Sequence, residues 1–121
     1  FFDNSSDYFE SYLKSNCMIT DLSGTAYTYA FFVKQPVIFF SKNENLIKKL
    51  NYHELSCFKD RDKIGLITKN TDQVLNTINN IESIKSNLLS SINILEKEML
   101  YLNSSQLRIK NLIALIIDEI M

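Results

Sequence analysis

The sequence is poor in histidine, cysteine, glycine and proline, and it carries no excess of charge of either sign. Its 121 residues include one histidine, two cysteines, two glycines and one proline, and the formal net charge is −1. Because so few imidazole and thiol groups are present, the sequence offers no zinc-ligand spacing, and it shows no serine-type catalytic triad. The balanced charge provides no basic surface for binding a phosphate backbone, so nucleic acid is not an expected partner.

Long apolar runs are also missing. No run approaches the roughly 20 apolar residues that a membrane-spanning helix needs, and no signal-peptide pattern opens the chain. Cys17 and Cys57 are better explained as buried thiols of a reducing compartment than as a disulfide. A chain of 121 residues can build one modest core, so we expect a single domain over residues 1–121.

The segment at residues 17–41 carries the strongest structural signal. A short apolar run at 17–20 leads into a turn of small residues, a helical run at about 25–33 and a second apolar run at 37–40. This order of strand, turn, helix and strand is typical of a βαβ unit. The turn therefore lies at the carboxyl end of a strand and opens a helix, where unpaired backbone N–H groups and the positive helix end can bind an anion.

Three residues of this turn suit a phosphate group. Ser23 and Thr25 supply hydroxyl donors, and Gly24 supplies a backbone without a Cβ atom, so that a ligand can approach closely. The turn predicts a phosphorylated ligand, most simply a nucleoside diphosphate; the alternative is a turn that only lets strand and helix pack. Asp21 joins the candidate site, where capping the helix or bracing the loop is the first expectation and direct ligand contact the second.

Further elements flank this unit. Before it comes a short helix with the capping pair Asp7 and Glu10, and after it come a helix at 44–50, a polar irregular stretch at 51–63 and a strand at 64–68. Helices follow over 71–99, with a cap at Asn70 or Thr71 and a break near Asn79–Asn80 or Ser83. A last helix begins after Ser104 or Ser105. Three strands that are apolar on both faces, each followed by helix, predict an α/β fold with a parallel sheet. We expect a Rossmann-like half-domain, with a βαβαβ nucleotide-binding portion at 1–70 and C-terminal helices at 71–121.

Several conspicuous groups are expected to be structural. The aromatic residues of the first long helix should pack in the core rather than form a stacking platform, and they are Tyr27, Tyr29, Phe31 and Phe32. His53 is expected to be a loop residue, because no nucleophile or second ligand accompanies it. The charged run at 59–63 should be a solvated loop, with contact of Arg61 or Lys63 to the phosphates as the alternative. The apolar stripe over 74–99 should be core or helix-pairing surface, with a coiled-coil partner as the alternative.

Two motifs together carry a resemblance to a known family. The sequence Ile-Thr-Asp-Leu-Ser-Gly at 19–24 is followed by an aromatic-rich helix and by Lys-Gln-Pro-Val-Ile-Phe-Phe at 34–40. This pattern resembles the CDP-glycerol glycerophosphotransferase family, which shows an ITD-x-S-(S/G) turn, a helix and a (G/D)KP-(V/I)-I-F strand. The match is close over roughly residues 12–41. The resemblance implies a two-lobed GT-B architecture, with this stretch in the C-terminal, donor-binding lobe.

The resemblance also implies roles for single residues. Ser23 and Gly24 match the family positions that meet the donor phosphates, and Thr25 would add a backbone N–H at the start of the helix. In the family a carboxylate that holds the ribose hydroxyls often lies four residues after the glycine or beside that position. Thr28 and Tyr29 occupy these positions here, which is a departure from the family pattern. The catalytic histidines of the family lie upstream of the matched stretch, so no catalytic residue and no metal ligand is expected in this chain.

One function and two alternatives follow from the resemblance. We expect the donor-nucleotide-binding portion of a CDP-glycerol glycerophosphotransferase-like enzyme of teichoic-acid or capsule synthesis. The chain would be the C-terminal part of a larger two-lobed protein, without transferase activity of its own. The alternatives are a UDP-sugar-dependent glycosyltransferase or epimerase of the same architecture, and a non-catalytic module whose helices dock a partner.

Expected ligands and partners follow from the same resemblance. No cofactor should be tightly bound; the donor nucleotide, such as CDP-glycerol or a UDP-sugar, is a substrate, and the acceptor is a polyol or a sugar. The missing N-terminal lobe is an expected partner, and self-association is expected because a half-sheet leaves an edge strand uncovered. The resemblance implies a bacterial, cytoplasmic protein and is compatible with peripheral attachment at the inner face of the membrane.

Overall fold

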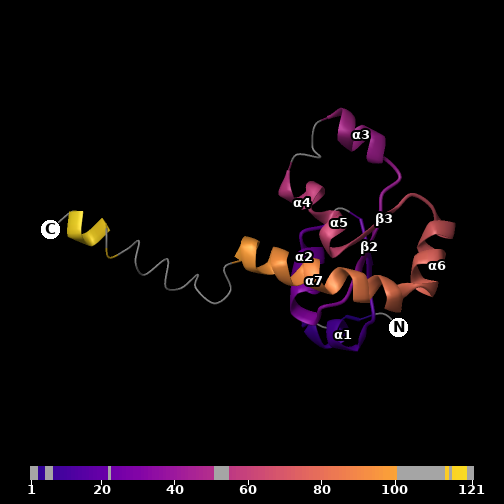
Figure 1. The fold of residues 1–121 in the computed structure, drawn as a ribbon, viewed down its shortest axis with the longest axis horizontal. Helices are drawn as coiled ribbons and strands as arrows, with labels where there is room; N and C mark the ends of the chain where they lie inside the picture. The colour runs from indigo at the N-terminus through magenta and orange to yellow at the C-terminus, as the bar shows by residue number, and fades with distance from the viewer. Residues whose placement is uncertain are drawn as a thin grey trace.

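A parallel sheet lies at the centre of the protein, with helices around it (Figure 1). The computed structural model describes residues 3–4, 7–21, 23–50, 55–100, 114 and 116–119. The elements in chain order are α1 (Phe9–Lys14), β1 (Met18–Thr20), α2 (Thr25–Val33), β2 (Val37–Phe40), α3 (Glu44–Lys49), α4 (Ser56–Lys59), α5 (Arg61–Ile64), β3 (Gly65–Thr68), α6 (Thr71–Asn79) and α7 (Ile81–Leu100). The expected α/β class with a three-stranded parallel sheet and a long helix near the C-terminus is confirmed.

The strands lie in the order β1, β2, β3, and both pairs are parallel. Helix α2 connects β1 to β2, and helices α3 to α5 connect β2 to β3, as parallel pairing requires. Ile19 of β1 pairs with Ile38 of β2, which pairs with Leu66 of β3. Since all carboxyl ends lie at one edge of the sheet, the turns that follow β1 and β2 are neighbours.

The main core is built on one face of the sheet by four elements. Helix α2, strand β2, helix α5 and helix α7 supply its buried side chains, which are Ala26, Tyr27, Tyr29, Ala30, Phe31, Val37, Phe39, Ile64, Ile92 and Leu95. The prediction of packed aromatic residues is confirmed for Tyr27, Tyr29 and Phe31. It is wrong for Phe32, which is 52% exposed because it lies on the outer side of α2, against the ring of Phe9.

Burial on the opposite face differs between the central and the outer strands. Ile38 of β2 is buried where α6 contacts β2 and β3. Its register partners Ile19 and Leu66 are 52% and 39% exposed. The three strands predicted to be apolar on both faces form the expected parallel sheet. On this face, however, only the central strand is buried, because α6 contacts β2 and β3 and leaves part of the face open.

The segment at 51–63 is more regular than predicted. Its described part forms the short helices α4 and α5, while residues 51–54, including His53, lie outside the described residues. Ile64 ends α5 instead of opening β3, since pairing with Val37 begins at Gly65.

The predicted boundaries of α6 and α7 are confirmed. The side chain of Asn70 accepts a hydrogen bond from the Gln73 N–H at 2.9 Å and caps α6. Asn80 lies between α6 and α7, at the predicted break. Ser104 and Ser105, the predicted caps of the last helix, lie outside the described residues.

The predicted capping pair of α1 forms only in part. Asp7 Oδ1 accepts a hydrogen bond from the Phe9 N–H at 3.0 Å, but Glu10 forms an ion pair with Lys14 at 2.7 Å. The N-cap position is held by Tyr8, without a side-chain cap. Asp7 therefore steadies the first turn, whereas Glu10 supports the helix along its exposed side.

Cys17, immediately before β1, is a free thiol, and burial raises its pKa. The side chain of Cys57 lies outside the described part of the structure. In that described part, no helix is both long and apolar enough to cross a membrane.

Candidate functional site

Two turns meet at the carboxyl edge of the sheet. The first turn follows β1 and contains Asp21, Ser23 and Gly24, and the second turn follows β2 and comprises residues 41–43. In open parallel sheets, ligands bind outside the carboxyl ends of the strands. The candidate site is therefore built from these two turns.

The first turn is shaped by short-range contacts. Ser23 Oγ accepts a hydrogen bond from the Thr25 N–H at 3.2 Å. The carbonyls of Ser23 and Gly24 accept from the next two N–H groups of α2, also at 3.2 Å. All three distances are at the long limit for an N–H···O bond, so these N–H groups are weakly engaged. An anion at the amino end of α2 would have to replace these contacts.

Gly24 is the N-cap residue of α2 and faces open space. Its φ of −63° and ψ of −24° are ordinary helical values, so the backbone conformation does not require glycine. A Cβ atom at this position would meet no described atom within 4 Å apart from its chain neighbours. The glycine thus leaves room in front of the turn without being needed for the fold.

Asp21 directly follows β1 and is exposed. Among the residues that the structure describes, its carboxylate has no hydrogen-bond or ion-pair partner, and the N-cap of α2 is Gly24. The contact that steadies the turn comes from Ser23. The Asp21 carboxylate therefore remains available to a ligand.

The two positions that stand for the family's ribose carboxylate point in different directions. Thr28 is exposed on α2, one turn beyond Thr25 and on the same side of the helix. Tyr29 is only 1% exposed; its Oη forms a hydrogen bond of 2.8 Å with Ser15 Oγ, and burial raises its pKa. Of these two residues, Thr28 alone is exposed.

A groove of about 420 Å³ borders both turns. It is lined by Asp21, Phe40, Ser41, Lys42, Asn43, Leu46, Ile47, Leu50 and Phe58. Its apolar side chains come from the end of β2, from α3 with the residue after it, and from α4, whereas its charged and amide groups come from the two turns. This volume is within the range of small-molecule sites.

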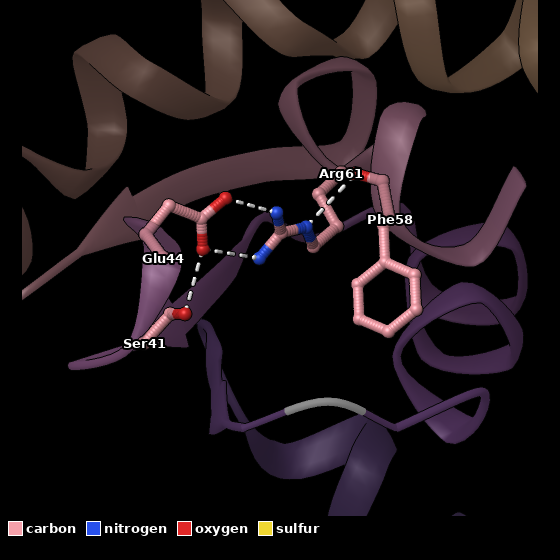
Figure 2. Close-up of polar contacts among 4 residues, drawn as sticks. All are labelled: Ser41, Glu44, Phe58 and Arg61. Carbon is pink, nitrogen blue, oxygen red and sulfur yellow. Dashed lines mark hydrogen bonds and ion pairs between the residues drawn. The ribbon is translucent and has the colours of Figure 1, made fainter. Parts of the chain in front are cut away.

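A buried ion pair that sequence reasoning missed supports the second turn (Figure 2). Arg61 of α5 is 2% exposed and Glu44 of α3 is 7% exposed. Two guanidinium nitrogens donate to the Glu44 carboxylate, Nη1 to Oε2 at 3.1 Å and Nη2 to Oε1. Ser41 Oγ also donates to Glu44 Oε2, at 2.7 Å, and Arg61 Nε donates to the Phe58 carbonyl at 2.9 Å. These bonds tie the end of β2 to α3, α4 and α5.

The surroundings of this pair favour the ionised form of Glu44. Burial would raise the pKa of Glu44, but the hydrogen bonds from Arg61 and Ser41 outweigh it and hold the pKa below its usual value. The guanidinium also lies over the rings of Phe39 and Phe58, with its central carbon 5.9 and 5.6 Å from their centroids. Each of the three guanidinium nitrogens thus has an acceptor.

These contacts correct the prediction of a solvated loop at 59–63. Arg61 is buried and its guanidinium is held by Glu44, so it is not free to reach phosphates at the first turn. Asp60 is buried as well and pairs with the exposed Lys63 at 3.0 Å; this contact raises the pKa of Lys63.

The sequence holds a partial signal for this arrangement. Phe58, Arg61 and Ile64 are spaced by three residues, which is typical of one helical face. That spacing indicates that Arg61 shares a side with two apolar residues. Its partner Glu44 lies 17 residues away in the sequence, and no local pattern links the two.

Comparison with known families adds to this geometry. The family model described as CDP-glycerol:poly(glycerophosphate) glycerophosphotransferase matches residues 1–114. The chain belongs to this family. A search of curated proteins and a search of solved structures each gave no match.

The glycerophosphotransferase match includes both turns and the groove, and it extends well beyond the motifs at 19–40. The resemblance drawn from those motifs is therefore confirmed. A Rossmann-like parallel sheet and family membership together support a transferase. Among the described residues, no group of three or more histidine, cysteine, aspartate or glutamate side chains could hold a metal ion.

Proposed function

We propose that this chain forms the donor-binding portion of a glycerophosphotransferase, and that the first turn holds the phosphates of CDP-glycerol. The observation that carries the proposal is the place of Gly24, at the amino end of a helix, at the carboxyl edge of a parallel sheet and in front of open space. Family membership supplies the class of donor.

Each residue of the first turn has a part in the proposed site. A diphosphate offers charged oxygen atoms, and hydrogen bonds to such atoms are shorter and stronger than neutral ones. The Thr25 N–H, whose present contact is 3.2 Å long, would turn to a phosphate oxygen. The freed Ser23 hydroxyl would donate to the same group, and Thr28 would face the ribose.

The proposed reaction is transfer of glycerol phosphate to an acceptor hydroxyl. The hydroxyl oxygen forms a bond to the phosphorus that carries glycerol, while the bond from this phosphorus to the oxygen of CMP breaks and CMP leaves. Negative charge grows on the leaving phosphate, where donors that are already in position stabilise it. The hydroxyl proton passes to a base that we assign to no described residue. The product would be a teichoic-acid-like or capsular polymer.

Calorimetric titration of the full chain with CDP-glycerol, CMP, CDP and UDP tests the proposal. Ser23→Ala should weaken CDP-glycerol binding about 5- to 150-fold, since a hydrogen bond to a charged group contributes about 1–3 kcal/mol. Gly24→Val should also weaken binding while leaving the melting temperature nearly unchanged, because its side chain fills open space. Ser90→Ala, at an exposed serine of α7, is the matched control and should bind like the wild type.

Two results would count against this function. Wild-type affinity in both turn variants would show that the turn is only structural. Tighter binding of UDP than of CDP, compared in the same titration, would favour a transferase that uses a UDP-sugar.

A further inference from the structure

An exposed apolar patch lies where α1 packs on the outer side of α2. The rings of Tyr8, Phe9 and Tyr12 contact one another with centroids 5.0 to 6.1 Å apart, and Phe9 lies 5.0 Å from Phe32. Tyr8 is 48% exposed, Phe9 40% and Phe32 52%, and Leu13, one turn after Phe9 on the same side of α1, is 67% exposed. We call these four exposed residues the α1–α2 patch. Contiguous exposed apolar surfaces of this kind mark interaction sites.

A second apolar surface belongs to residues 109–120, the C-terminal segment. In the sequence its apolar residues recur at intervals of three and four, which is typical of one helical face, and they are Ile109, Leu112, Ile113, Ile116, Ile117 and Ile120. Its described residues, 114 and 116–119, are helical, and Ile116 and Ile117 are each 48% exposed. A short amphipathic helix is stabilised mainly by packing of its apolar face on another surface.

We propose that the C-terminal segment docks with this apolar face on the α1–α2 patch of its own chain. The contact joins the two ends of the sequence, since α1 begins at Phe9 and the segment ends at residue 120. It does not involve the turns at the carboxyl edge of the sheet, so it is independent of the proposed function.

The end of α7 lies close to the patch. Helix α7 contacts α2, and Glu96 of α7 forms an ion pair with Lys34 (Figure 1). Lys34 directly follows α2 and stands two residues after Phe32 of the patch. Helix α7 ends at Leu100, about 6 Å along its axis beyond Glu96. The chain therefore leaves α7 near the end of α2 at which Phe32 lies.

The chain between α7 and the segment is long enough for this contact. Residues 101–108 connect the two, and a chain of this length spans up to about 30 Å when it is extended. Closing so short a loop costs little entropy and gives the segment a high effective concentration at a surface of its own molecule. The patch of the same chain is therefore favoured over the patch of a second copy.

Charges and chain path favour the same orientation. Helix α1 is acidic in its first turn, with Glu10, and basic in its last turn, with Lys14. The sequence of the C-terminal segment has the opposite order, with Lys110 near its start and Glu119 near its end. A segment that runs parallel to α1 brings unlike charges together, whereas an antiparallel one opposes like charges. Phe9, at the start of α1, lies at the end of α2 where the chain leaves α7, so the path also favours the parallel orientation.

Tryptophan fluorescence of the full chain tests the docking, because the sequence contains no tryptophan of its own. Ile116→Trp places an indole on the apolar face of the segment, and the matched control Asp118→Trp places one on the opposite side. We expect Ile116→Trp to emit at shorter wavelength and to be quenched less by acrylamide than Asp118→Trp, because the patch shields the first indole from water. Equal emission and equal quenching in the two variants would show that the segment does not dock.

Substitutions in the patch identify the surface that is covered. Leu13→Ser and Phe32→Ser, added together to Ile116→Trp, should move its emission to the longer wavelength of Asp118→Trp. Both side chains are more than half exposed, so the core that they leave behind stays packed, which circular dichroism checks. The matched control is Leu75→Ser, which removes a 54% exposed leucine of α6, on the other face of the sheet, and should leave the emission unchanged. Short-wavelength emission in the patch variant would place the segment elsewhere and overturn the proposal.

Dilution separates the patch of the same chain from the patch of a second copy. The emission of Ile116→Trp should be the same at low and at high micromolar concentration, because a contact within one chain does not depend on concentration. Sedimentation velocity of the same samples reports association. A shift to shorter wavelength that appears only as the protein associates would place the segment on a second copy and contradict the contact within one chain.

Discussion

The two turns at the carboxyl edge of the sheet are held in opposite ways. The first turn is steadied by contacts among neighbouring residues, at 3.2 Å each, and Gly24 faces open space. The second turn is tied to a buried ion pair: Ser41 Oγ donates to Glu44 Oε2 at 2.7 Å, and Arg61 Nη1 of α5 donates to the same oxygen at 3.1 Å. The first therefore offers N–H groups that a ligand can take over, and the second offers a fixed wall.

The largest effect should come from breaking the support of the second turn. Arg61→Met leaves the buried Glu44 carboxylate without its partner, and we expect a loss of about 3–5 kcal/mol in the free energy of unfolding. Ser23→Ala, in the first turn, should cost less than about 1 kcal/mol because its contact is exposed and long. Urea denaturation of both variants checks the contrast. Equal losses would remove the distinction between the two turns.

The two glycines sharpen the same comparison. A Cβ atom on Gly65, at the start of β3, would overlap the backbone carbonyl of Val37, so Gly65→Ala should cost about 3 kcal/mol. Gly24→Ala should change stability by less than about 1 kcal/mol, since nothing crowds that position. Thermal melts of the two alanine variants test this order. A stable Gly65→Ala protein would show that the two strands can separate without cost.

The comparison also explains which parts of the site could be predicted. The first turn is a local pattern of small residues after a strand, so Ser23 and Gly24 could be named from the sequence. The ion pair joins residues that are 17 positions apart, and its value depends on burial that no local pattern reports. The parallel sheet was predictable because each strand is a short apolar run followed by helix. Its partly open faces at Ile19 and Leu66 were not, since they depend on where α6 lies.

Acid should weaken the second turn before the first. The pKa of Glu44 is lower in the folded state than in the unfolded state, so the ionised carboxylate stabilises the fold. This stabilisation is fully present above the unfolded-state pKa of about 4.3. It is lost as the pH falls through the lower pKa of the folded state. Urea denaturation at pH values from 7 to 3 should therefore show that the free energy of unfolding of the wild type falls with pH. The fall should be smaller in Glu44→Gln. Parallel curves for the two proteins would place the acid sensitivity elsewhere.

The smallest expected effect concerns the exposed side of α2. Thr28→Glu places a carboxylate where the family often has one for the ribose, and it should tighten CDP-glycerol binding about 2- to 10-fold. Its effect on stability should stay within about 0.5 kcal/mol because Thr28 is exposed. Calorimetric titration gives the affinity. An unchanged value would place the ribose away from Thr28.

Amide chemical shifts of the isotopically labelled full chain during titration with CDP test the central claim most directly. We expect the largest changes at the N–H groups of Ser23, Gly24 and Thr25, which meet the phosphates, and at residues 41–43, which border the groove. The chemical shifts of the amides around Lys34 and Glu96, at the other end of β2, should not change. Changes confined to that end, or none at saturating CDP, would contradict a donor site at the carboxyl edge of the sheet.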